Sequence, residues 1–260
     1  MAHILVTVLR RDRLVVLAGL GGVTVLAWLY LILLAAGMGD GPGAMGEAVD
    51  NARPTPWTAG DFALMVLMWS VMMVGMMLPG ATPMILLFAM VNRKKREAGH
   101  PFVPTGAFAL GYAGAWTAFS LFATIGQWAL HSAALLSPML VSTSAVLAGV
   151  LFIAAGTYQL TPLKHACLKN CRSPVHFIMT RWRSGGGGAL RMGLEHGAYC
   201  VGCCWFLMGL LFVLGVMNLL WVAALTILVL VEKAAPHGEW TARISGVAML
   251  AAGLYLLILA

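Results

Sequence analysis

The chain has 260 residues, of which 61% are hydrophobic and only 10% are charged. Soluble domains are about 45–50% apolar and about 25% charged, so this chain has too little polar surface to cover a soluble globule. The composition excludes an ordinary cytosolic enzyme, a secreted disulfide scaffold and a disordered chain. It indicates an integral membrane protein.

Seven apolar segments are long enough to approach the roughly 20 residues of a transmembrane helix. They predict an all-α, polytopic transmembrane bundle that forms a single domain over residues 1–260. If one segment lies in the membrane interface, the number of spans falls to six. The segments cover residues 14–36, 62–91, 105–131, 139–160, 190–214, 217–231 and 240–259.

The positions of the basic residues predict the orientation. With the N-terminus in the cytoplasm, 15 of the 16 lysines and arginines fall on the cytoplasmic side, and only Arg53 lies outside. This follows the positive-inside rule and predicts a multi-pass membrane protein with a cytoplasmic N-terminus. The orientation of the helices in the membrane therefore accounts for the net charge of +7, and no nucleic-acid partner is expected.

Local patterns predict several further features. Pro79 and Pro83 should kink the second segment. Residues 37–60 should form an irregular acidic outer loop, and the glycine run 185–188 a flexible hinge. The fifth and sixth segments should form a tight hairpin because only a few residues, including Gly215, join them.

The predicted hairpin would bring Glu232 near Glu195 and His196. An interfacial pair between Glu232 and Lys233 is the alternative.

All five cysteines fall on the predicted cytoplasmic side, where thiols stay reduced and stable disulfides are disfavoured. His165, Cys167 and Cys171 form an H-x-C-x3-C pattern in the loop after the fourth segment. Lys164, Lys169 and Arg172 beside them favour the thiolate, which is the form that binds metal. The alternative is two free cysteines in a basic loop.

The fifth segment carries a second candidate site. His196, Cys200, Cys204 and Met208 follow one another at four-residue steps, with Cys203 beside them and Glu195 at the inner end. One helix face would thus present imidazole, thiols and a thioether, which together predict a metal site. The alternative is packing, because free cysteine behaves as a small hydrophobic residue.

The second segment holds six methionines within residues 65–77, and Met68, Met72 and Met76 recur every four residues. Thioethers are soft, neutral ligands that select Cu(I) over Zn²⁺ or Mg²⁺. We therefore predict Cu(I) as the metal. Zinc would suit the cysteines alone, and a methionine stripe can also be plain packing. Met76 and Met208 should lie at about the same membrane depth, because each is a similar number of residues from its inner helix end.

Three motifs together resemble a bacterial family of predicted metal-binding integral membrane proteins, first filed as a domain of unknown function. The motifs are Trp69-x2-Met72-Met73-x2-Met76-Met77-x-Pro79, Tyr158-Gln159-Leu160-Thr161-Pro162-Leu163-Lys164-x2-Cys167-x3-Cys171, and Cys200-x2-Cys203-Cys204-x3-Met208. Members are associated with copper delivery to tyrosinase-type oxidases. The resemblance implies metal binding with copper as the favoured ion.

The functional hypothesis is a Cu(I)-binding or Cu(I)-transferring membrane protein that is not an enzyme. Its partners would be the metal ion, the lipid bilayer, and a cuproenzyme or periplasmic copper protein. One alternative is a membrane thiol oxidoreductase using Cys167 with Cys171, or Cys200 with Cys203. Another is a structural subunit of a larger complex.

Overall fold

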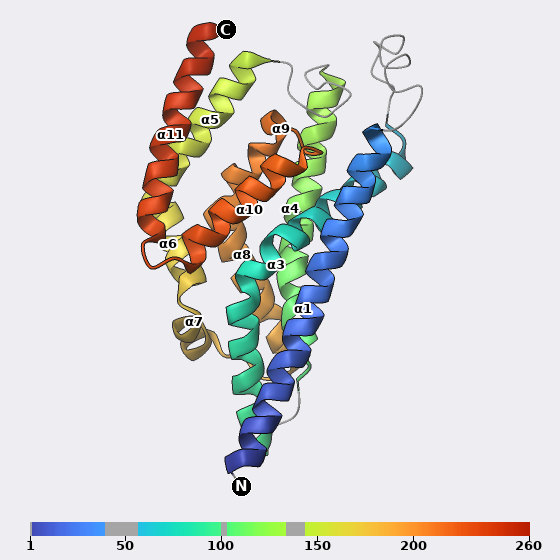
Figure 1. Cartoon of the computed structure of the whole chain (residues 1–260), viewed down its shortest axis with the longest axis vertical. Coiled ribbons are helices and arrows are strands. Elements are labelled where there is room, and N and C mark those ends of the chain that lie inside the picture. The colour runs from blue at the N-terminus through green and yellow to red at the C-terminus, as the bar shows by residue number, and fades with distance from the viewer. Residues whose placement is uncertain (1, 40–56, 100–102, 134–143) are drawn as a thin grey trace.

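The computed structural model describes residues 2–39, 57–99, 103–133 and 144–260, and this part of the chain is helical with no strand (Figure 1). The all-α prediction is confirmed. The helices are α1 (Ala2–Gly39), α3 (Ala59–Glu97), α4 (Thr105–Ser132), α5 (Ala145–Gln159), α6 (Pro162–Arg172), α7 (Pro174–Arg181), α8 (Gly185–Gly209), α9 (Leu211–Leu214), α10 (Leu219–Ala234) and α11 (Gly238–Leu259).

Five stretches of the described helices are long and apolar enough to cross a membrane: Arg13–Gly37, α3, α4, Gly185–Leu214 and α11. The pair α5 and α6 adds a sixth if it counts as one span bent by 63°. Each of the seven predicted segments is helical, but α10, with 16 residues, is shorter than a straight span needs. Residues 139–143 of the predicted fourth segment and 40–56 of the predicted outer loop lie outside the described residues.

Helices α4 and α8 form the closest helix pair, and glycines make this approach possible. A Cβ on Gly193 would lie 2.0 Å from the carbonyl oxygen of Phe108, and one on Gly111 would lie 2.0 Å from that of Leu190. Gly197 meets Ala115 in the same way one turn along. Small residues at such spacing let two backbones touch, which is the usual basis of tight helix packing in membranes.

Helices α5 and α11 make the second tight pair and lie side by side at one edge of the bundle (Figure 1). Gly149 and Gly156 on α5 face Gly253 and Gly246 on α11, and a Cβ on any of them would lie within 3.0 Å of the other helix. Helix α11 is more exposed than α3, α4 and α8: 17% of its apolar window is buried, against 44% in each of those spans.

Helix α3 bends along its length, as Figure 1 shows, although Pro79 and Pro83 do not interrupt it. Its start is fixed by a capping box in which Thr58 accepts a hydrogen bond from the backbone of Asp61 and the Asp61 carboxylate accepts one from the backbone of Thr58. A proline removes one backbone hydrogen bond and clashes with the preceding turn, which accounts for the bend.

Three local predictions are wrong. The glycine run 185–188 is the first turn of α8 and not a hinge, with Gly185 at φ 81°. The segment 162–181 after α5 is two helices and not a loop. The tight hairpin is absent because α10 packs mainly on α3 and α11 and touches α8 only slightly.

Candidate metal centre

One face of α8 carries a buried stripe of candidate ligands. Each of its members is at most 3% exposed, so the whole stripe faces the bundle interior. Its four-residue steps put the side chains on one side of the helix. The members are His196, Cys200, Cys203, Cys204 and Met208.

Helix α6 brings the other two cysteines to the α8 stripe. Thr161 caps α6 by accepting a hydrogen bond from the backbone of Lys164, and Pro162 occupies its first turn. The thiol of Cys171 lies close to the thiols of Cys200 and Cys203. The sulfur of Cys167 lies 3.0 Å from the point where Gly202 would carry a Cβ.

Cysteines 33 residues apart in the sequence therefore form one cluster between α6 and α8. We call it the cysteine cluster: Cys167, Cys171, Cys200, Cys203 and Cys204.

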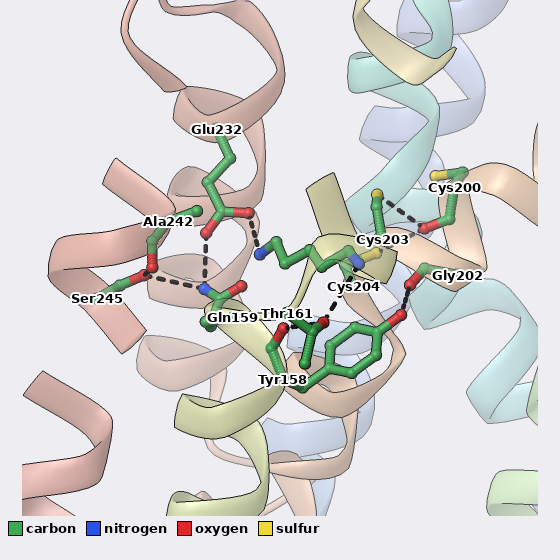
Figure 2. A network of polar contacts seen from close by, with 11 residues as sticks. Tyr158, Gln159, Thr161, Cys200, Gly202, Cys203, Cys204, Glu232, Ala242 and Ser245 are labelled. Atoms are coloured by element: carbon green, nitrogen blue, oxygen red, sulfur yellow. Dashed lines mark hydrogen bonds and ion pairs between the residues drawn. The ribbon is translucent and has the colours of Figure 1, made fainter. Parts of the chain in front are cut away.

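The thiols of the cluster bond to one another and to the backbone. Cys203 and Cys204 both donate to the carbonyl oxygen of Cys200, at 3.1 and 3.0 Å (Figure 2). All five cysteines are free thiols. Within the described residues, no group of three or more His, Cys, Asp or Glu side chains stands ready to hold a metal ion. To bind one, Cys203 and Cys204 would have to rotate away from the Cys200 carbonyl.

Cys200 is the centre of these contacts. The ammonium of Lys233, from the end of α10, donates to its sulfur at 2.9 Å. The Tyr112 hydroxyl of α4 lies 3.0 Å from the same sulfur and 3.0 Å from the carbonyl oxygen of Met77 on α3. Four helices thus meet at this thiol.

The sequence reasoning did not find Tyr112 or Lys233. Lys233 counted only as a charge that sets the topology, and nothing in the sequence distinguishes Tyr112 from the other tyrosines.

A buried ion pair lies beside the cluster. Lys164 of α6 and Glu232 of α10 are 2.7 Å apart, with side chains 0% and 2% exposed. Gln159 of α5 donates to both Glu232 and Ser245 of α11, at 2.8 and 2.9 Å (Figure 2). This network ties the bend between α5 and α6 to α10 and α11. Glu232 therefore pairs with Lys164, and among the described residues no ion pair joins it to Lys233, the alternative partner.

The methionine stripe of α3 is buried in the same core. Met68, Met72 and Met76 are at most 3% exposed and belong to one packed cluster with the cysteines. Nearby on α3, the Trp69 indole donates to the side-chain oxygen of Gln127 on α4 at 2.6 Å. The Tyr112 hydroxyl, which touches both Met77 and Cys200, is the direct link between the methionine helix and the cysteine cluster.

The predicted histidine and glutamate ligands differ in their surroundings. His196 is buried among the rings of Phe108, Tyr112 and Phe177, and its Nδ1 has no hydrogen-bond partner. A neutral imidazole nitrogen is a common metal ligand, so His196 could supply one.

His165 and Glu195 have other surroundings. His165 lies about 200° around α6 from Cys167, because a helix turns about 100° per residue. Its Nδ1, like that of His196, is buried without a hydrogen-bond partner. The carboxylate of Glu195 forms ion pairs with Arg183 at 3.1 Å and with Arg191 at 3.4 Å.

A helical bundle that gathers thiols, thioethers and an unpartnered imidazole in its core has the ligand chemistry of proteins that handle soft metal ions. The chain belongs to the PpoB2 family, described as copper chaperones, whose family model matches residues 66–256. The family resemblance seen in the three sequence motifs is thereby confirmed, and with it a copper-related role. Comparisons with curated proteins and with solved structures gave no match.

Proposed function

We propose that this chain is a multi-pass protein of a bacterial inner membrane that binds Cu(I) and passes it on to a cuproenzyme or a periplasmic copper protein. The observation that carries the proposal is the cysteine cluster, in which two helices distant in the sequence bring five reduced thiols together. Membership of a copper chaperone family supports copper as the ion.

The membrane location rests on two features. The long helices expose large apolar side chains such as Leu26, Phe122 and Ile258 around the outside of the bundle. The basic residues follow the cytoplasmic ends of the helices, as the positive-inside rule requires. Exposing this much apolar surface to water would destabilise a soluble bundle.

Cu(I) is a soft cation, and thiolates and thioethers are the ligands that it prefers. Cys200, Cys203, Cys204 and Cys171 would supply thiolates, and His196 an imidazole nitrogen. Met68, Met72, Met76 and Met208 would supply neutral thioethers in the apolar part of the bundle, where a charged ligand would be costly. His165 and Glu195 are the weakest members of the predicted ligand set, since one lies on the far side of α6 and the other is paired with arginines.

Metal content tests this proposal. The protein, purified in detergent and loaded anaerobically with Cu(I) in the presence of glutathione, is expected to hold near-stoichiometric copper by mass spectrometry. The variant Cys200→Ser/Cys203→Ser/Cys204→Ser should lose nearly all of it, because serine oxygen is a hard, poor ligand for Cu(I). Met72→Leu/Met76→Leu should lower the copper affinity while Leu preserves the packing volume.

The matched control is Ile85→Leu, a conservative change at an equally buried position of α3 that carries no sulfur. It should leave copper content unchanged. If the wild-type protein holds zinc and only the cysteine variant loses it, the methionines pack the core and are not metal ligands. Full-length protein without metal after copper loading would refute the proposal.

A thiol oxidoreductase is the second candidate, because the Cys171 thiol lies close to that of Cys200, and the ammonium of Lys233 donates to the Cys200 sulfur. Oxidation of these two thiols to a disulfide would need an electron acceptor such as a quinone. This candidate expects a Cys171–Cys200 disulfide on addition of quinone to metal-free protein, detected by mass spectrometry of peptides.

A further inference from the structure

The four-residue spacing of the methionine stripe leads from Met76 to Gly80, which has no side chain. Met68, Met72, Met76 and Gly80 follow one another on the continuous helix α3. A Cβ on Gly80 would lie 3.4 Å from Cδ and 3.7 Å from Nζ of Lys233. The side chain of Lys233 therefore lies against α3 at the position where the next side chain of the stripe would begin.

The same ammonium is 2.9 Å from the sulfur of Cys200. It thus sits at the junction between the end of the methionine stripe and the centre of the cysteine cluster. No carboxylate among the described residues pairs with it, because Glu232, its neighbour in the sequence, is taken by Lys164. A half-buried ammonium whose close partner is a sulfur is unusual, since buried charges are normally paired with an opposite charge.

We propose that the ammonium of Lys233 occupies the cation position beside the Cys200 sulfur in the metal-free protein, and that Cu(I) replaces it there when copper binds. This inference rests on the function proposed above. With Cys200 as the thiolate that the ammonium balances, one monovalent metal ion takes the place of one monovalent ammonium, and the charge at this sulfur does not change. Any further thiol that ligates the ion releases its proton to water. Two cations cannot share one sulfur at this distance, because their repulsion is strong in a poorly solvated interior.

The displaced side chain of Lys233 can reach water at the end of α10. Lys233 is the last residue but one of α10, and the chain beyond it, at Ala234 and Pro236, is exposed. Its four-carbon stem can carry the ammonium outward to the cytoplasmic water, as lysines at the ends of membrane helices do. There the ammonium would also lie near the C-terminal carbonyl groups of α10, which favour a positive charge.

Amine labelling measures the exchange directly. Purified full-length protein is treated with an amine-specific acylating reagent, with and without bound Cu(I), and peptides are quantified by mass spectrometry. Labelling of Lys233 is expected to rise severalfold when copper is bound, because the ammonium leaves the sulfur for water. Lys94, an exposed lysine of α3, is the internal control and should label equally in both states.

A second arm tests the ammonium–sulfur contact without metal. In Cys200→Ala the acceptor is gone, so Lys233 should label as strongly in the metal-free protein as it does in the copper-bound wild type. Copper content is measured in the same samples. Bound copper with unchanged Lys233 labelling would overturn this inference and leave the proposed function standing. Failure to take up any copper would overturn both.

Discussion

Replacing Gly193 with alanine is expected to prevent the bundle from folding. The added Cβ would lie 2.0 Å from the carbonyl oxygen of Phe108, and the obstacle is backbone rather than a movable side chain. Overpacking in cores commonly costs about 1–3 kcal/mol when side chains can adjust. Here α4 and α8 would have to separate, so the loss should exceed that range. The yield of monodisperse protein and its thermal unfolding in detergent measure it.

The chain supplies matched controls for this prediction. Gly111→Ala, on the other side of the same crossing, should be as damaging, because its Cβ would lie 2.0 Å from the carbonyl oxygen of Leu190. Gly114→Ala lies one turn further along α4 with open space around it and should be tolerated. Equal melting temperatures for Gly111→Ala and Gly114→Ala would show that α4 and α8 do not meet in this way.

The crossing matters for function because it positions the site. Tyr112 follows Gly111 directly, and Cys200 lies two turns beyond Gly193. The contact between the Tyr112 hydroxyl and the Cys200 sulfur therefore depends on the close approach of the two backbones. Small residues at this crossing fix where the methionine helix and the cysteine cluster meet.

Replacing Glu232 with methionine is expected to destabilise the protein by about 3–5 kcal/mol, because it leaves the buried ammonium of Lys164 without its counter-charge. The two side chains are 2% and 0% exposed, so water cannot compensate. Chemical or thermal unfolding in detergent, followed by tryptophan fluorescence, gives the change. The exposed pair Arg93–Glu97 is the control, and Glu97→Gln should cost no more than about 1 kcal/mol.

The double variant Lys164→Met/Glu232→Met separates charge from packing. Removing both charges should restore most of the lost stability, since replacing a buried ion pair by apolar residues is often neutral. Gln159 keeps its hydrogen bond to Ser245 in this variant. A double variant as unstable as the single one would mean that the pair acts through shape and not through charge.

The ion pair also bears on copper binding. It joins α6, which carries Cys167 and Cys171, to α10, which carries Lys233. A loss of the pair should therefore loosen the cysteine cluster even where the protein still folds, and the double variant should recover copper content together with stability.

The sequence by itself determined the all-α fold, the apolar helices, the candidate ligands and the family. These depend on composition, on runs of apolar residues and on spacing along one helix, all of which are local. The buried stripe of α8 was predictable because four-residue steps place His196, Cys200 and Cys204 on one face. The kink of α3 was predictable because a proline acts on its own helix.

Only the tertiary structure decided which helices meet. It joined Cys171 to Cys200, gave Glu232 to Lys164, and placed Lys233 between Gly80 and Cys200. The hairpin prediction failed because proximity along the chain does not fix packing: α10 lies mainly against α3 and α11 and touches α8 only slightly. Contacts between helices depend on where glycines allow two backbones to touch and on which buried charges form ion pairs. Neither can be predicted from the spacing of residues along a single helix.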